Sequence, residues 1–116
     1  MSNGNTYEVF AVRYAHNGKR MRNENFVFPD AHDVAMPLDY FVWVIRNEER
    51  TFVVDTGFGE VASLKRGSPL LRSTTEGLAL LGIDAAEVED VIITHMHYDH
   101  AGGIGEFPKA TFHIQD

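Results

Sequence analysis

Residues 94–103, THMHYDHAGG, constrain this chain more than any other segment, because they hold three histidines and an aspartate within six positions. Neutral imidazole and carboxylate are the ligands that zinc prefers when no thiolate is present, and the sequence contains no cysteine. In a chain with six histidines among 116 residues, the pattern HxHxDH arises by chance about once in a thousand such chains. The segment therefore predicts a metal site.

The spacing of the motif divides its ligands into two pairs. His95 and His97 are separated by one residue and point to the same side of an extended segment, so one cation can bind both. Asp99 and His100 follow where the chain is expected to turn into a helix, and they diverge toward a second cation. We predict two divalent cations side by side, with zinc as the first choice and iron, manganese or cobalt as alternatives.

A further candidate, Asp55, ends the apolar strand of VVDTG at residues 53–57. A carboxylate that is buried at the end of such a strand needs hydrogen-bonding partners. We predict that Asp55 orients the ligand histidines, or the loop that carries them, without binding metal itself. The alternative is an aspartate that only caps the turn.

The other histidines are predicted to lie outside the site. His16 falls in a predicted turn and is expected to be solvated. His32 falls in a proline-bracketed loop, where a place at the rim of the pocket is the alternative. His113 lies on the last predicted strand, where recruitment as a ligand is the alternative.

Composition and charge limit the partners. Seventeen acidic against ten basic residues give a net charge of -7, which argues against nucleic acid because phosphate binding depends on Lys and Arg. No segment approaches the roughly 20 apolar residues of a membrane span, and the N-terminus lacks the basic and apolar regions of a secretory signal. We expect a cytoplasmic protein that binds metal and a small molecule, and neither nucleic acid nor a membrane.

The order of the expected elements indicates the α/β class, with a mixed sheet and flanking helices. The predicted strands are residues 6–15, 38–46, 51–57, 88–94 and 110–115, and the predicted helices are 60–66, 73–81 and 101–107. The Asn-Gly pair in HNGK (16–19) predicts a hairpin turn. Residues 29–37 are expected to form a loop, and the polar turn 47–50 joins the strongest predicted hairpin.

TFVVDTGF at 51–58 and VIITHMHYDHAGG at 91–103 resemble the metallo-β-lactamase superfamily. Within it, PLDYFVWVIRNEERTFVVDTG at 37–57 is most similar to the N-acyl homoserine lactonases, which are quorum-quenching enzymes. The resemblance implies an αββα sandwich of two similar halves, with the metals at one edge between the two sheets. Residues 1–116 are then expected to be the N-terminal half of a single domain whose C-terminal half is absent.

The resemblance also implies the roles of the site residues. His95 and His97 would bind the first metal, Asp99 and His100 the second, and Asp55 would be the supporting aspartate at the strand end. The family's remaining ligands, two histidines and a bridging aspartate, come from beyond the motif. The residues after the motif offer only His113 and Asp116, and neither lies where the family pattern needs it.

Half of a sandwich would expose one apolar sheet face, carrying Phe41, Trp43 and Ile45 or their alternates. Exposed apolar faces of that size mark an interface or an aggregation hazard. We therefore expect this face to bind the C-terminal half of the domain or to drive self-association. The chain alone is expected to be inactive, because its site lacks ligands.

For the complete domain we expect a metal-dependent hydrolase that opens an N-acyl homoserine lactone-like ring by attack of metal-bound hydroxide. Asp99 is the catalytic candidate, because it lies beside both metals and can steer the proton to the leaving group. No G-x-S-x-G motif occurs, which agrees with water as the attacking group. The alternatives are a thioester hydrolase of the hydroxyacylglutathione hydrolase type and a non-catalytic metal-binding or interaction fragment.

Overall fold

The computed structural model describes residues 6–115, and its framework is a five-stranded sheet. The strands, in spatial order, are β1 (Glu8–Asn17), β2 (Leu38–Arg46), β3 (Thr51–Val54), β4 (Asp90–Ile93) and β5 (Thr111–Ile114). Pairing is antiparallel from β1 to β3 and parallel from β3 to β5. The predicted mixed sheet is therefore confirmed.

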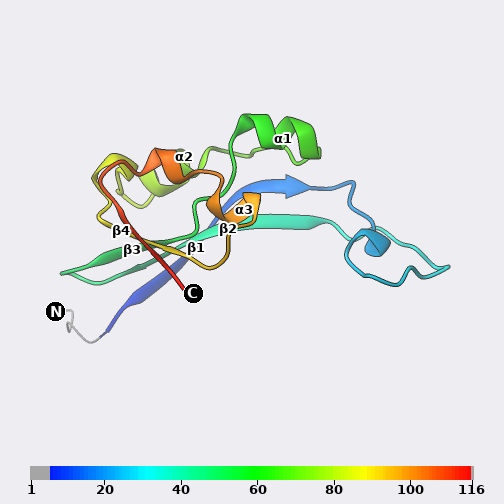
Figure 1. Cartoon of the computed structure of the whole chain (residues 1–116), viewed down its shortest axis with the longest axis horizontal. Helices are drawn as coiled ribbons and strands as arrows, with labels where there is room; N and C mark the ends of the chain where they lie inside the picture. The colour runs from blue at the N-terminus through cyan, green and yellow to red at the C-terminus, as the bar shows by residue number, and fades with distance from the viewer. Residues whose placement is uncertain (1–5, 116) are drawn as a thin grey trace.

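Helices flank the sheet, as the sequence predicts. They are α1 (Glu60–Arg66), α2 (Thr74–Ala79) and α3 (Tyr98–Ala101), with the short 3₁₀ turns η1 (Arg22–Glu24), η2 (Ala85–Glu87) and η3 (Ile104–Glu106). Figure 1 shows α1 and α2 on the same side of the sheet. We call the side that these helices cover the inner face and the opposite side the outer face.

Most predicted elements are confirmed to within a few residues. β2 and α1 have the predicted bounds, and residues 47–50 join β2 to β3 as a hairpin, in which the Asn47 amide donates to the Arg50 carbonyl at 2.9 Å. The helix predicted at 73–81 is the shorter α2, and Gly82 follows it with a φ of 76°. A positive φ is the conformation for which glycine is favoured just past a helix end.

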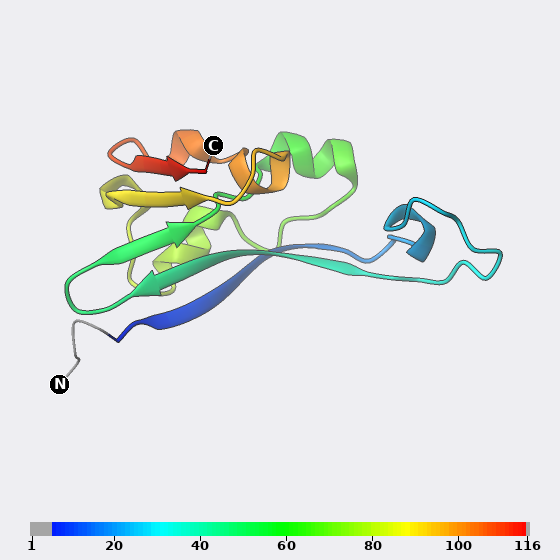
Figure 2. The same cartoon turned by 60° about the horizontal axis from the view of Figure 1, so that its bottom comes forward.

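The hairpin turn predicted at residues 16–19 is wrong. β1 continues through His16 and Asn17, which pair with Asp39 and Leu38 of β2. Residues 18–37 leave the sheet as an extension that we call the arm, which projects away from the helices (Figure 2). β2 alternates buried and exposed residues along its length, whereas the polar segment after Gly18 has no such pattern, so β2 is the better partner for β1.

The arm is held together by its own polar contacts. The Asn23 side chain donates to the Asp30 carbonyl and accepts from the Asp30 amide, each at 2.9 Å. The Arg22 guanidinium pairs with the Asp30 carboxylate at 2.9 Å and lies 5.0 Å from the centre of the Phe26 ring. The predicted loop at 29–37 lies within the arm and is confirmed.

The helix predicted at 101–107 starts three residues earlier than expected, at Tyr98. α3 begins at Tyr98, inside the motif, because the His97 carbonyl accepts from the amides of His100 and Ala101 at 2.9 Å. It ends before Gly102, and only η3 follows in the predicted range. Three of the four predicted ligands thus lie at or in the first turn of a helix, and one lies on the extended segment before it.

The core lies on the inner face of the sheet. Val42, Val44, Val53 and Val91 are fully buried there and belong to one apolar cluster with Leu78 of α2. Burial of each such side chain stabilises the fold by about 1.5–3 kcal/mol. The core therefore fixes how β3 and β4 lie against the helices. It also fixes the position of the carboxyl ends of these strands, after which Asp55 and the motif follow.

The outer face is apolar and exposed. Trp43 pairs with Ala11 on one side and with Val54 on the other, and Val54 pairs with Ile92, so these four side chains form a row across four strands. Trp43 keeps 41% of its surface exposed, and Phe41 next to it in the strand keeps 38%. No helix of residues 6–115 lies over this face (Figure 1).

The N-terminus of α2 generates a prediction about stability. The Ser73 hydroxyl accepts from the Glu76 amide at 3.1 Å, and the Glu76 carboxylate accepts from the Ser73 amide at 3.0 Å. Ser73→Ala is expected to lower the free energy of unfolding by about 1 kcal/mol, because an amide of the first turn loses its acceptor. Urea unfolding followed by circular dichroism measures this.

Ser73→Asp is the matched control, because its carboxylate can still accept at the helix start, and its stability should stay within a few tenths of a kcal/mol of the parent. The hydrogen bond from the Ser73 amide also lowers the pKa of Glu76. A lowered folded-state pKa means that this contribution is present at neutral pH and is lost as the pH falls through that pKa. Equal stability of the alanine and aspartate variants would contradict the capping role.

Candidate metal centre

The ends of β3 and β4 bring two distant segments together. Because these strands are parallel, with Val54 beside Ile92, their carboxyl ends lie at the same edge of the sheet. Asp55 follows β3 and Thr94 follows β4, and the Asp55 amide donates to the Ile92 carbonyl at 2.8 Å. This edge of an open α/β sheet is where ligand-binding groups commonly gather.

The Asp55 carboxylate is buried, with 3% of the residue exposed, and it accepts hydrogen bonds from the start of the motif and from its end. The Thr94 amide donates to it at 2.8 Å, and the Thr94 hydroxyl lies 2.9–3.0 Å from both carboxylate oxygens. The His100 ring donates from Nδ1 at 2.6 Å. Asp55 has a φ of 66°, a left-handed conformation that aspartate tolerates better than most residues.

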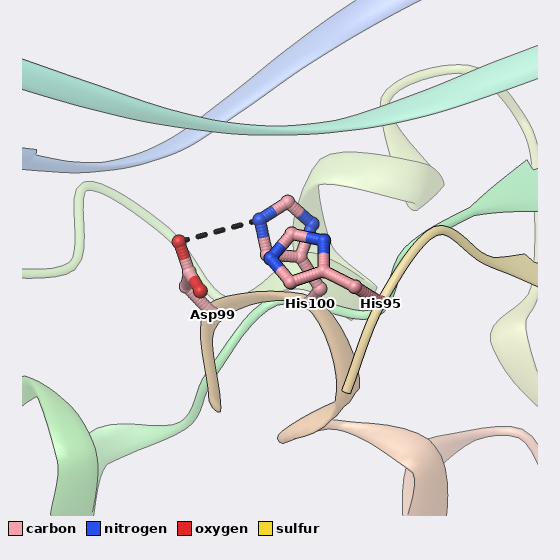
Figure 3. A group of neighbouring side chains, drawn as sticks. All are labelled: His95, Asp99 and His100. Atoms are coloured by element: carbon pink, nitrogen blue, oxygen red, sulfur yellow. Dashed lines mark ion pairs between the residues drawn. The ribbon is translucent and has the colours of Figure 1, made fainter. Parts of the chain in front are cut away.

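The contact with Asp55 determines which nitrogen of the neutral His100 ring carries the proton. An ionised carboxylate can only accept hydrogen bonds, so the proton of a neutral His100 ring lies on Nδ1. The other nitrogen, Nε2, then carries a free lone pair, and it lies 3.4 Å from a carboxylate oxygen of Asp99 (Figure 3). A histidine held in this way presents a metal-ligating nitrogen away from the buried aspartate.

His95, Asp99 and His100 form the cluster to which a cation would bind. One ligand atom from each lies within 4.8 Å of the others, and Figure 3 shows the three side chains gathered at one place. The ring centres of His95 and His100 are 3.9 Å apart. Two imidazoles and a carboxylate are a donor set that fits zinc and similar divalent ions, so the residues present suit a metal site.

His97 lies next to this cluster. Its ring centre is 4.6 Å from that of His95, with the two rings nearly perpendicular, and its side chain is exposed at the start of α3. His95 therefore has both the His97 ring and the His100 ring as neighbours. The division of the four residues into two metal-binding pairs stays a prediction.

The backbone of α3 is tied to the turn that follows β3. Both the amide and the hydroxyl of Thr56 donate to the His100 carbonyl, at 2.7 and 2.9 Å, and the Thr56 hydroxyl accepts from the Gly103 amide at 2.9 Å. A Cβ atom at Gly103 would lie 2.5 Å from the Thr56 carbonyl oxygen, and one at Gly102 would lie 2.9 Å from the Gly57 carbonyl oxygen. The two glycines of the motif therefore allow this close approach.

Tyr98 packs on the side of α3 that faces the core cluster. Its ring centre is 5.4 Å from that of Phe58, and the Arg66 guanidinium lies 4.2 Å from the ring centre. Burial, followed by a hydrogen bond with Tyr40, raises the pKa of Tyr98 to about 12. The hydroxyl therefore keeps its proton at neutral pH, which agrees with a packing role.

The sequence analysis missed Thr56 and Thr94. Each lies beside a predicted site residue, at the carboxyl end of an apolar strand, and that adjacency is the signal that could have identified them. Their hydroxyls connect Asp55 and the turn after β3 to the motif.

The remaining histidines lie outside the cluster, as predicted, and the His16 side chain is 43% exposed, although it does not lie in a turn. It lies on β1, and its Nδ1 contacts the Asp39 carboxylate at 2.6 Å, a contact that lowers the pKa of Asp39. His113 pairs with Asp90 at 2.9 Å on the outer face. His32 lies in the arm, and Asp116 lies outside the described residues.

The chain is similar in sequence to a known protein superfamily and to individual enzymes. The sequence model of the metallo-beta-lactamase superfamily matches residues 35–115. The chain is 34% identical over 96 residues to the N-acyl homoserine lactonase AttM of Azorhizobium caulinodans, covering 72% of this chain and 36% of that protein. It is also 36% identical over 76 residues to the hydroxyacylglutathione hydrolase of Aeromonas hydrophila, covering 62% of this chain and 24% of that protein.

A solved structure supports the same fold. A quorum-quenching N-acyl homoserine lactone lactonase aligns with a TM-score of 0.67 and 22% identity, over 90% of this chain and 43% of that one. The chain thus spans about a third of the length of the lactonase relative and less than half of this structure.

The burial of Asp55 generates a prediction about the metal-free chain. Asp55→Asn is expected to lower the free energy of unfolding by about 1–3 kcal/mol, because an amide presents one acceptor oxygen and its NH₂ group faces donors. Urea unfolding in the presence of a chelator measures this, without any contribution from metal.

Asp90→Asn is the matched control, since Asp90 also pairs with a histidine but the His113 side chain is 50% exposed. An exposed ion pair contributes about 0–1 kcal/mol, so this variant should stay close to the parent. If the two asparagine variants lose the same stability, Asp55 does not hold the motif in place.

Proposed function

Since the chain belongs to the metallo-β-lactamase superfamily, we propose that the protein carrying it is a metal-dependent hydrolase that opens a lactone of the N-acyl homoserine lactone type. The observation that carries the proposal is the cluster of His95, Asp99 and His100 beside His97, with its ligand atoms within 4.8 Å and its His100 ring hydrogen-bonded to buried Asp55. The lactone class is taken from the lactonase relatives, among them AttM of Azorhizobium caulinodans at 34% identity.

The proposed ligands are His95 and His97 for one cation and Asp99 and His100 for a second, with zinc as the first choice. A bound divalent cation supplies Lewis acidity to such a site, which activates water and polarises a carbonyl oxygen. Asp55 keeps the His100 proton on Nδ1 and so leaves Nε2 as the donor atom. Asp99 is part-exposed, with 26% of its side chain accessible, and we assign it the transfer of the proton to the leaving alkoxide.

Thioester hydrolysis is the second candidate. It is favoured by the identity of 36% to a hydroxyacylglutathione hydrolase and of 32% to the human acyl-coenzyme A thioesterase MBLAC2. In both reactions water attacks the carbonyl carbon of an acyl group, so the described site suits either. The groups that distinguish a lactone ring from a thioester must contact the parts of the substrate away from the carbonyl.

We further propose that residues 1–116 form the N-terminal half of one domain. The chain spans 36% of the length of its lactonase relative, and the outer face that carries Trp43 is apolar and has no cover among the described elements. A C-terminal half would cover this face and supply the remaining ligands, and the chain alone would be inactive.

None of the helices within residues 6–115 has the length and apolar character that crossing a bilayer needs. We propose a cytoplasmic location.

The function is tested in the complete protein with an N-acyl homoserine lactone and a hydroxyacylglutathione thioester as substrates. The expected result is about two metal ions per chain by elemental analysis and faster turnover of the lactone. His97→Ala should weaken metal binding by at least about 10-fold and abolish hydrolysis, because one cation loses an imidazole. His113→Ala, which removes a histidine outside the cluster, should change neither.

Faster turnover of the thioester would replace the first candidate by the second. Absence of bound metal and of hydrolysis would leave the non-catalytic module, and unchanged activity of His97→Ala would remove His97 from the site.

The half-domain proposal is tested on the 116-residue chain by sedimentation velocity over a range of concentrations. We expect concentration-dependent self-association, and Trp43→Glu should reduce it, because it places a charge in the middle of the apolar row. Leu64→Glu is the matched control, since Leu64 is 83% exposed on α1, over the inner face. A stable monomer at all concentrations would contradict the proposal.

A further inference from the structure

Tyr14 joins the first strand to the motif. It lies on β1 and is fully buried, and its ring packs edge-on against Phe58 with 5.2 Å between the ring centres. Its hydroxyl donates to the backbone carbonyl of Asp99 at 3.1 Å, across 85 residues of chain. Burial first of all, and then the negative charge of Asp99, raise the pKa of Tyr14 well above its usual value, so the hydroxyl remains a donor.

The Asp99 carbonyl needs a donor from outside the helix. α3 has four residues, and the last carbonyls of a helix have no partner within it. The Gly103 amide, which one more turn of helix would direct to Asp99, donates to the Thr56 hydroxyl instead. The two carbonyls at the centre of the motif are therefore held by two other segments: Asp99 by Tyr14, and His100 by Thr56.

We propose that Tyr14 is a positioning residue for the metal site, whose hydroxyl fixes the orientation of α3 and so directs the Asp99 carboxylate toward His95 and His100. The inference rests on the proposed metal-dependent function. Asp99 and His100 are adjacent in a short helix, so a rotation of α3 moves both ligands with respect to His95, which lies on the extended segment before it. The Tyr14 and Thr56 contacts together oppose such a rotation.

The two parts of the Tyr14 side chain have separate roles. The ring fills the core against Phe58 and Tyr40, with 6.2 Å between the centres of the two tyrosine rings. The hydroxyl contributes the contact with Asp99. Tyr14→Phe keeps the ring and removes only the hydroxyl, so it distinguishes positioning of the motif from packing of the core.

The experiment is a cobalt(II) titration of the complete protein, followed by the visible absorption of the bound ion. Tyr14→Phe is expected to raise the cobalt dissociation constant by about 10-fold, the lower end of the effect of residues that orient metal ligands, and to shift the visible band. A 4-aminophenylalanine introduced at position 14 restores an N–H donor at the same place, and it should recover both the affinity and the band.

Ser63→Ala is the matched control. The Ser63 hydroxyl is buried and donates to the backbone carbonyl of Ser68 at 2.7 Å, on α1 and away from the motif. Its loss should lower the urea midpoint about as much as Tyr14→Phe does while leaving cobalt binding unchanged. This comparison separates a general loss of stability from an effect on the site.

The outcomes distinguish the inference from the function on which it rests. If the parent protein binds cobalt and Tyr14→Phe binds it with the same affinity and spectrum, Tyr14 does not position the site and the inference is wrong. If the parent protein and Ser63→Ala both bind no cobalt, the proposed metal site fails, and the inference fails with it. Weaker binding in Tyr14→Phe without recovery by the amino variant would also overturn it.

Discussion

The buried carboxylate of Asp55 is the interaction on which the arrangement of the site depends. It joins the end of β3 to both ends of the motif, through Thr94 and through His100. An ionised carboxylate in a buried position must be fully hydrogen-bonded, because an unpaired one is strongly unfavourable. Satisfying Asp55 therefore forces the motif to return to the edge of the sheet. The same contacts set which nitrogen of His100 faces outward.

The sheet serves two purposes through its two faces. On the inner face, fully buried valines such as Val44 and Val53 join the strands to the helices. On the outer face, Trp43 lies in an apolar row that no helix of the described part covers. Strands that are hydrophobic on both faces are typical of a sheet that other layers of the fold cover on both sides. The histidine cluster lies at the end of this sheet, so its polar side chains do not interrupt either face.

Local sequence signals predicted most of the fold and the composition of the site. The strand at 38–46, the polar turn at 47–50 and the helix at 60–66 each lie within one short segment, and each was found. Predictions that depended on contacts between distant segments were incomplete. The Asn-Gly turn after His16 was overridden by pairing with β2, which lies twenty residues farther along the chain. The contact of Tyr14 with Asp99 spans 85 residues and leaves no periodic pattern in the sequence.

The parallel pairing of β3 with β4 has a consequence for how the molecule folds. Asp55 and Thr94 are 39 residues apart in sequence, and both α1 and α2 lie between them. Closing so long a connection loses chain entropy before the contacts at its ends can compensate, so such pairings form slowly. The β2–β3 hairpin can form from local contacts alone, whereas the contact of Asp55 with Thr94 requires closure of the long connection between β3 and β4. The motif residues are thus expected to be among the last parts of the chain to reach their native places.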